Sequence, residues 1–160
     1  MNGERVFIGL GANLGDARAT VNAAFEALAT LPGTRPVARS SLYRTAPFEA
    51  QGPDFINAVA ELRSTLEPEA LLQALQAIEA QHDRQRPYRN APRTLDLDLL
   101  FMGERTIATP TLTVPHPRLH QRAFVLEPLL ELAPGFSHPG LGALAAWRAG
   151  TAGQAIERLV

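Results

Sequence analysis

The sequence contains no cysteine and no lysine. Without cysteine the chain has no disulfide bonds and no thiolate chemistry, which fits a reducing cytoplasm. Without lysine it has neither a Schiff-base amine nor the lysine of a P-loop, because all fifteen basic residues are arginine. Any anion that the protein binds must therefore be held by guanidinium groups, backbone amides or a metal ion.

Long apolar runs and excess charge are also absent. The sequence has no run of about 18 apolar residues, so no transmembrane helix is predicted. Residues 1–5 carry no signal-peptide pattern. The formal net charge of −1 gives no global attraction for nucleic acid or an anionic membrane. We therefore expect residues 1–160 to form one cytoplasmic domain, monomeric because no interface stripe stands out.

Residues 91–101 are the most informative stretch, because apolar and acidic side chains alternate along it. On a strand, Asp96 and Asp98 would share one face. The other face would carry the apolar side chains of Leu95, Leu97, Leu99 and Phe101. Two neighbouring carboxylates on so apolar a segment either meet water or share a hard cation, for which Mg²⁺ is the natural candidate.

Two basic segments lie on either side of this strand. Residues 83–93 hold four arginines between prolines, and residues 116–122 hold two histidines and two arginines. A solvated charge run would explain the first segment, but arginine forks beside a carboxylate pair also suit a polyphosphate that shares a metal ion. His116 and His120 could ligate zinc only on a helix, which the neighbouring prolines disfavour. We therefore favour phosphate contacts by His116 and Arg122.

The hydrophobic periodicity predicts a strand, a helix, two strands, a helix and a strand. Strands are expected at residues 6–11, 37–45, 54–63 and 95–101. The helices are expected to begin at Asp16 and Pro68. This order predicts an α+β, ferredoxin-like β-α-β-β-α-β core, with an antiparallel sheet that carries helices on one face. Residues 125–160 are expected to add C-terminal helices that cover more of that sheet.

Three features leave more than one interpretation open. The spacing of Gly9, Gly11 and Gly15 is one residue too long for a dinucleotide-binding fingerprint, so a tight strand-to-helix turn open to close approach is favoured. Phe48 lies in a loop rich in proline and glycine, where it either packs over the core or contacts a flat ligand. Asn57 either ties down a loop or recognises the edge of a heterocycle.

Five segments together resemble the 6-hydroxymethyl-7,8-dihydropterin pyrophosphokinase family of folate biosynthesis. They occur in the family's order and span most of the chain, at residues 9–16, 43–47, 54–58, 92–98 and 112–117. The resemblance implies transfer of a pyrophosphoryl group from MgATP to the hydroxymethyl oxygen of the pterin, with release of AMP. Another Mg-dependent phosphoryl or nucleotidyl transferase is the alternative. A non-catalytic module for RNA or a regulatory ligand fits less well, because the paired aspartates would repel phosphate without a metal.

The resemblance also implies roles for individual residues. It places two Mg²⁺ ions on Asp96 and Asp98, and it gives catalytic roles to Arg84 and Arg93. Its ATP contacts fall on Leu72, Gln76, Glu79, Arg86, Arg89, Leu99, Leu112, Thr113 and His116. Its pterin contacts fall on Thr45, Pro47, Phe48, Phe55, Asn57, Arg122 and Phe124. In that set Phe55 and Phe124 would stack the ring from either side, and Asn57 would read its polar edge.

Two departures from the family pattern concern the site. Many members have Trp-Gly before the Pro-Arg pair, whereas this chain has Asn90 and Ala91, so a tryptophan lid over the pterin cannot be carried over. Pro117 stands where a tyrosine often follows the histidine, so a phosphate contact by that hydroxyl is lost. We expect the loop from Asp83 to Pro92 to close over the substrates.

Overall fold

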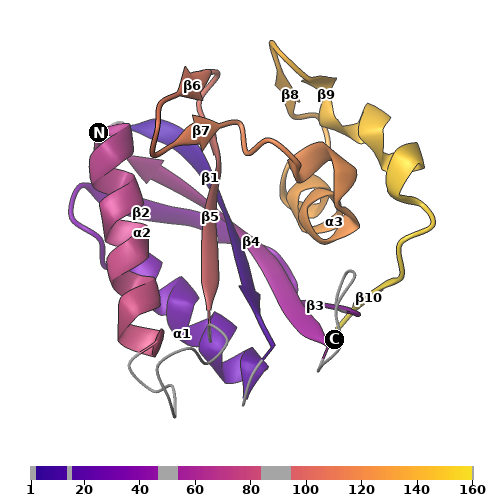
Figure 1. Cartoon of the computed structure of the whole chain (residues 1–160), viewed down its shortest axis with the longest axis horizontal. Coiled ribbons are helices and arrows are strands. Elements are labelled where there is room, and N and C mark those ends of the chain that lie inside the picture. Colours follow the sequence, from indigo (N-terminus) through magenta and orange to yellow (C-terminus); the bar gives the residue numbers. More distant parts are fainter. Residues whose placement is uncertain (1–2, 14–15, 47–53, 84–94, 160) are drawn as a thin grey trace.

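A six-stranded antiparallel sheet forms the centre of the protein in a computed structural model of the chain (Figure 1). The structure describes residues 3–13, 16–46, 54–83 and 95–159. The strands of the sheet are β1 (Glu4–Ala12), β2 (Thr34–Arg39), β3 (Tyr43–Thr45), β4 (Phe55–Ser64), β5 (Asp96–Met102) and β10 (Ile156–Arg158). Their order is β10-β3-β4-β1-β5, and β2 also pairs with β4. With a helix after β1 and another after β4, this order confirms the predicted α+β, ferredoxin-like core.

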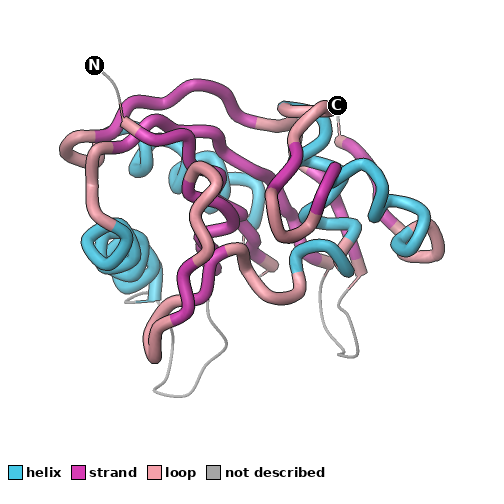
Figure 2. The backbone as a smooth tube through the Cα atoms, turned by 90° about the horizontal axis from the view of Figure 1, so that it is seen from above, coloured by secondary structure: helices cyan, strands magenta, loops and turns pink. Residues whose placement is uncertain are grey.

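Helices cover both faces of the sheet, so the prediction of helices on one face is wrong. The first face is covered by α1 (Ala17–Ala29) and α2 (Pro68–Asp83), and the second by α3 (Ala123–Leu132) (Figures 1 and 2). The reason lies in β4, which is buried on both faces from Ile56 to Leu62. A strand that is apolar on both faces requires cover on both.

The two long helices begin where they were expected. The Asp16 side chain accepts a hydrogen bond from the Ala19 backbone N–H at 3.1 Å, which satisfies a donor in the first turn of α1. Pro68 is the first residue of α2, where its missing N–H costs no helical hydrogen bond. In the described part of the chain, no helix is both long and apolar enough to cross a membrane.

The chain beyond α3 is only partly helical, and the short strands β8, β9 and β10 lie where further C-terminal helices were expected. Prolines and glycines at positions 134, 135, 139 and 140 interrupt the helical pattern. The remaining elements are β6 (Ile107–Ala108), β7 (Thr113–Val114), the 3₁₀ helix η1 (Leu119–Gln121), β8 (Ser137–His138), β9 (Gly142–Ala143) and the 3₁₀ helix η2 (Leu144–Thr151). The final strand, β10, returns to the sheet beside β3.

Two aromatic side chains in this half of the molecule make structural contacts. His138 is 2% exposed, its Nε2 bonds to the carbonyl oxygen of Arg105 at 3.1 Å, and its Nδ1 accepts from the Gly140 N–H at 3.0 Å. These bonds give His138 a structural role. Trp147 is 38% exposed and packs edge-on against His120, with ring centroids 4.6 Å apart.

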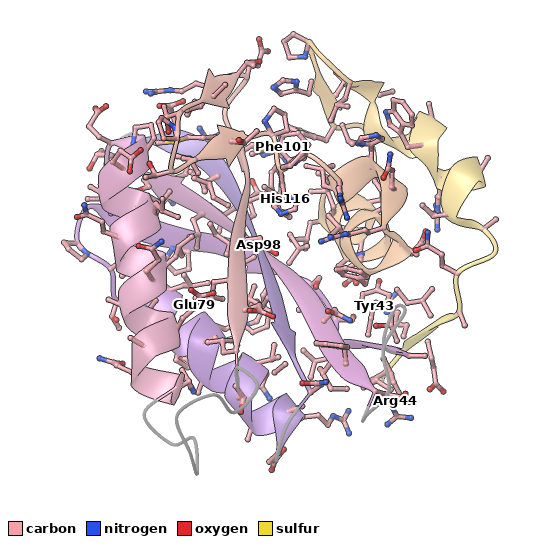
Figure 3. All side chains as sticks on the ribbon, in the orientation of Figure 1. Tyr43, Arg44, Glu79, Asp98, Phe101 and His116 are labelled. Carbon is pink, nitrogen blue, oxygen red and sulfur yellow. The ribbon has the colours of Figure 1, made fainter. Side chains whose placement is uncertain are left out.

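A β-bulge in β5 corrects one predicted strand face. The pairing with β1 shifts by one residue between Phe7 and Ile8, which leaves Leu100 as the extra residue. Phe101 therefore packs on the α3 face against Phe7, with ring centroids 6.3 Å apart (Figure 3). Met102 takes the inward position in the core under α1 and α2. The prediction that Phe101 shares a face with the leucines of this strand is wrong, although those leucines do share one core.

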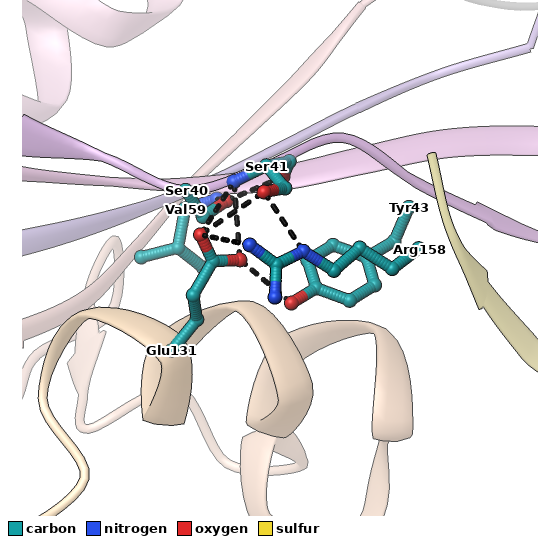
Figure 4. A network of polar contacts seen from close by, with 6 residues as sticks. All are labelled: Ser40, Ser41, Tyr43, Val59, Glu131 and Arg158. Carbon is teal, nitrogen blue, oxygen red and sulfur yellow. Dashed lines mark hydrogen bonds and ion pairs between the residues drawn. The ribbon is translucent and has the colours of Figure 1, made fainter. Parts of the chain in front are cut away.

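One carboxylate on α3 ties this helix to the sheet (Figure 4). Glu131 accepts hydrogen bonds from the Ser41 backbone N–H at 3.0 Å, the Ser41 hydroxyl at 3.1 Å and the Tyr43 hydroxyl at 2.6 Å. The guanidinium of Arg158 lies 3.5 Å from the same carboxylate. Burial alone would raise the pKa of Glu131, but the hydrogen bonds from Tyr43 and Ser41, with the charge of Arg158, lower this pKa below its ordinary value.

This network predicts a pH dependence of stability. Because the pKa of Glu131 is lower in the folded than in the unfolded chain, its contribution is complete above the unfolded value of about 4.3 and is lost as the pH falls through the folded value. Glu131→Gln should therefore lower the free energy of unfolding at neutral pH by about 1–3 kcal/mol. The difference from the wild type should shrink below about pH 4 in urea unfolding curves. A difference that stays constant under acidic conditions would contradict the assignment.

Candidate active site

The strand register aligns predicted site residues across the α3 face of the sheet. Tyr43 on β3 pairs with Asn57 on β4, Asn57 pairs with Gly11 on β1, and Gly11 pairs with Asp96 on β5. Paired residues share a face, and neighbouring strands lie about 4.8 Å apart. Asn57 and Asp96 therefore lie on either side of Gly11, with their backbones about 10 Å apart.

Gly11 leaves the sheet surface open between these residues, whereas a Cβ atom on Gly9 would meet the Leu100 side chain at 3.4 Å. Gly9 pairs with Asp98, as Gly11 pairs with Asp96. Both glycines lie within β1, as the predicted strand at residues 6–11 requires. A Cβ atom on Gly11 would come within 3.0 Å of the Asn57 Oδ1 atom. The missing side chain of Gly11 therefore creates space between the Asn57 amide and the Asp96 carboxylate, as close approach of another group requires.

The carboxylate pair fits a magnesium ion that arrives with a phosphate ligand. Asp98 is half-buried and Asp96 is exposed, on the face opposite the leucines of β5. Among the described residues, no group of three or more histidine, aspartate or glutamate side chains could hold a metal ion. Mg²⁺ is commonly held through one or two carboxylates, with water and substrate phosphates as its other ligands. A permanently bound zinc ion would need more protein ligands.

Glu79 supports the strand that carries the two aspartates. Its Oε2 accepts a hydrogen bond from the backbone N–H of Leu97 at 2.8 Å, between Asp96 and Asp98 in the chain (Figure 3). β5 is the last strand on its side of the sheet, so this N–H would otherwise lack a partner in the ladder. The nucleotide contact predicted for Glu79 stays a prediction, and the structure adds a bond to the strand itself.

His116 lies beside Asp98 as a neutral hydrogen-bond donor (Figure 3). Burial lowers the pKa of His116, and the charges of Arg122 and Arg118 lower it further against the opposing charge of Asp98. Its Nδ1 accepts a hydrogen bond from the Arg118 backbone N–H at 3.4 Å. The neutral ring therefore carries its proton on Nε2, which can donate to a phosphate oxygen.

The predicted pterin residues of the sheet meet in one contact. Asn57 is buried, and its Nδ2 donates a hydrogen bond to the Thr45 hydroxyl at 2.8 Å. This bond joins β4 to β3 and leaves the Asn57 Oδ1 toward Gly11. Phe55 is half-buried and pairs with Thr45, two residues along the strands from the pair of Asn57 and Tyr43. The alternative in which Asn57 ties down a neighbouring segment is confirmed, because its side chain joins β4 to β3, and the recognition of a heterocycle edge stays a prediction.

Two more predicted pterin residues, Arg122 and Phe124, lie at the beginning of α3. Arg122 precedes the first turn, and its guanidinium carbon lies 5.4 Å from the Phe124 ring centroid. Gln154 supports this end of the helix, and no pattern in the sequence indicates this contact. Its Oε1 accepts from the Ala123 N–H at 2.9 Å, and its Nε2 donates to the Gln121 carbonyl at 2.8 Å.

Several of the predicted ATP residues come from β5 and from the segments beside it. Leu99 and Leu112 belong to the core under α1 and α2, and half-buried Leu72 packs against it. Gln76 and Thr113 are exposed. These side chains thus lie on the face of β5 opposite Asp98, or at its edge. A ligand that contacts both groups must pass around this edge strand.

Some predicted site residues lie outside the described residues. They are Pro47, Phe48, Arg84, Arg86, Arg89 and Arg93. Most of the loop expected to close over the substrates lies there too. The roles assigned to these residues stay predictions.

An antiparallel α+β sheet with paired carboxylates, a neutral histidine donor and a buried amide indicates a metal-dependent phosphotransferase. The sequence model of the family described as 7,8-dihydro-6-hydroxymethylpterin-pyrophosphokinase (HPPK) matches residues 7–134. A 2-amino-4-hydroxy-6-hydroxymethyldihydropteridine pyrophosphokinase of Pseudomonas aeruginosa is 46% identical over 157 residues, which cover 98% of this chain and 97% of the relative. The enzyme of the same name from Synechocystis is 43% identical over 84% of this chain and 69% of its own length.

Solved structures agree on the fold. One described as HPPK-DHPS in complex with substrates matches 93% of this chain with a TM-score of 0.73 at 13% identity, and this chain spans 43% of that chain. Wild-type Plasmodium falciparum HPPK-DHPS with pteroate matches 91% of this chain with a TM-score of 0.74 at 13% identity, and this chain spans 42% of it.

The chain belongs to the 7,8-dihydro-6-hydroxymethylpterin pyrophosphokinase family. This confirms the predicted family and, with it, the predicted enzyme class. The protein is an ATP-dependent diphosphotransferase of folate biosynthesis, which transfers pyrophosphate to hydroxymethyldihydropterin.

Filling the open surface should impair catalysis more than folding. The backbone of Gly11 has no positive φ, so β1 accepts a valine there. Gly11→Val should reduce kcat/KM by about 10²-fold, because its methyl groups displace Asn57 or the ligand. Overpacking should cost about 1–3 kcal/mol, which leaves the protein folded. Initial rates of AMP release and thermal unfolding measure the two effects.

Gly135→Val is the matched control, since nothing lies within 4 Å of a Cβ at that position and its φ is not positive. Its rates should equal those of the wild type. If Gly11→Val also kept the wild-type KM for the pterin and the wild-type kcat, the open surface would not be the ligand site.

Proposed function

We propose that this chain binds MgATP and 6-hydroxymethyl-7,8-dihydropterin on the α3 face of the sheet, and that Asp96 and Asp98 hold two Mg²⁺ ions. The observation that supports this most directly is the register that sets Asn57 and Asp96 on either side of Gly11. The row of residues Asn57, Gly11 and Asp96 offers a polar partner for a heterocycle at the Asn57 end and oxygen ligands for a metal at the Asp96 end. Gly11 lies between these two residues and has no side chain, so it leaves room for the reacting groups.

The pterin binds at the Asn57 end of this row. The Asn57 amide recognises the polar edge of the ring, and its bond to the Thr45 hydroxyl holds the amide plane in place. Phe55 and Phe124 supply aromatic faces for the flat ring. This orientation directs the hydroxymethyl group toward the aspartates.

The nucleotide binds around the outer edge of β5. Its base contacts Leu72, Leu99 and Leu112. Leu99 and Leu112 belong to the core under α1 and α2, and Leu72 packs against that core. Its phosphates lie at the carboxylates, where His116 donates from Nε2 to a phosphate oxygen. When bound, magnesium neutralises phosphate charge and aligns the β-phosphorus for in-line attack.

The arginines supply the remaining positive charge. Arg84 and Arg93 stabilise charge that develops during transfer, and Arg86 and Arg89 contact the nucleotide phosphates. Guanidinium groups suit this task because they offer paired donors at a fixed spacing. Residues 1–160 act as one cytoplasmic, monomeric pyrophosphokinase domain, for which the length, the lack of cysteine and the net charge of −1 are the support.

Replacing one carboxylate should test the metal assignment. Asp98→Asn keeps the shape of the side chain but removes its charge, so AMP formation should fall by about 10²–10³-fold, and Mg-dependent nucleotide binding should weaken. Rapid-quench product analysis and calorimetry with MgATP measure both. Glu104→Gln, which removes an exposed carboxylate from the turn after β5, is the control and should keep wild-type rates. Full activity of Asp98→Asn would refute the assignment.

The same product analysis separates the candidate reactions. Wild-type protein with MgATP and the hydroxymethyl pterin should release AMP and the pterin diphosphate. ADP would instead identify a simple kinase that uses the same carboxylate pair.

Arg93→Ala should reduce turnover rather than binding. A lost charge-stabilising donor costs about 2–4 kcal/mol in the transition state, so kcat should fall by roughly 10²–10³-fold with a smaller change in either KM. Steady-state kinetics measure this, and Arg35→Ala, on the exposed strand β2, is the control. A change in kcat below about threefold would exclude a transition-state role for Arg93.

A further inference from the structure

The proposed pterin pocket has two walls from distant parts of the chain. Thr45 and Asn57 belong to adjacent strands of the sheet, whereas Arg122 and Phe124 lie at the beginning of α3. Aromatic stacking and amide recognition both depend on the distance between these walls. Contacts that join α3 to the sheet therefore bear on substrate binding even where they lie outside the pocket.

Glu131 joins the two walls through β3. Its carboxylate accepts from the backbone N–H and hydroxyl of Ser41 and from the hydroxyl of Tyr43 (Figure 4). Arg158 donates from Nε to the Ser41 hydroxyl at 3.0 Å, which links β10 to the same network. Hydrogen bonds are directional, so this network determines where β3 lies relative to α3 more narrowly than apolar packing does.

The network lies close to the pocket along both elements. Tyr43 pairs directly with Asn57, and it shares its buried strand face with Thr45, two residues further on. On α3, Glu131 follows Phe124 by seven residues, which is about two helical turns on one face. A shift of Tyr43 would therefore be transmitted to Thr45 and to the hydrogen bond that holds Asn57.

We propose that Glu131 is a positioning residue for the pterin pocket: it holds β3, and through β3 the Thr45–Asn57 pair, at a fixed distance from the beginning of α3. Because Gln154 separately holds the first turn of α3, removal of Glu131 chiefly releases the β3 wall. This inference rests on the proposed function, since it assumes that the pterin binds between these walls. Glu131 itself touches neither substrate.

The chain offers a matched control on the same helix. Glu127 lies one turn before Glu131, and the side chains of the two glutamates are 20% and 21% exposed. Both line the same open cleft of about 530 Å³ between α3, η2, β3 and β10. Glu127, however, pairs with Arg148 of η2 at 2.6 Å. Its removal should therefore cost a similar ion pair without releasing β3.

The test compares Glu131→Ala, Glu127→Ala and Tyr43→Phe by steady-state kinetics, at a temperature where circular dichroism shows each protein folded. Glu131→Ala should raise the KM for the pterin by about tenfold and leave the KM for ATP unchanged, and Glu131→Gln should recover part of the loss. Tyr43→Phe should change the pterin KM in the same direction by about threefold. Glu127→Ala should leave both KM values at the wild-type level.

Two results would overturn the proposal. One is equal pterin KM values for Glu131→Ala and Glu127→Ala, which would leave Glu131 with a role in stability alone. The other is an equal rise in both KM values for Glu131→Ala, which would indicate a general loosening of the fold. Failure of the proposed function would be recognised separately, because Asp98→Asn and Gly11→Val would then keep wild-type rates of AMP release.

Discussion

The register between β1 and its two neighbours is the constraint on which the site depends. Antiparallel pairing places partners on the same face of the sheet, so the position of Gly11 opposite both Asn57 and Asp96 determines what those two side chains can share. A register slip of one residue would move the Asn57 amide or the Asp96 carboxylate to the opposite face of the sheet. The site is therefore specified by the same hydrogen bonds that hold the centre of the sheet together.

Burial on both faces of β4 has a second consequence for the site. The core under α1 and α2 alone would leave Val59 and Phe7 uncovered, and α3 covers them. Because α3 must pack there, its first turn brings Arg122 and Phe124 to the face that carries the carboxylates. The hydrophobic requirement and the functional arrangement are thus met by one helix. The hydrogen bonds that Glu131 accepts from Ser41 and Tyr43 then set the position of that helix relative to β3.

Periodicity and residue type were sufficient to predict β1, β4 and β5, the two long helices, the N-cap at Asp16 and the face that carries the aspartates. They merged β2 and β3 into one strand at residues 37–45, and they predicted helices where β8, β9 and β10 lie. They failed where geometry depends on partners distant in the chain. The bulge that turns Phe101 to the α3 face arises from pairing with β1, which alternation along β5 does not encode. The contacts of Glu131 and Gln154 span 90 and 31 residues, and an isolated glutamate or glutamine carries no sign of such a partner. The resemblance to a family supplied the substrate-binding residues, whereas composition alone left the site open between water and a metal.

Some charges of the site belong to protein side chains, and others arrive with the nucleotide. Two carboxylates with no third ligating side chain among the described residues favour a metal that comes with its phosphate ligands. A histidine whose pKa is lowered by burial stays neutral and contributes a donor without adding charge beside those carboxylates. Positive charge for the transferred group must then come from magnesium and from arginines, the only basic residue type in the chain besides histidine. The fixed sheet thus orients the uncharged pterin, and the balance of charge is completed only when the nucleotide binds.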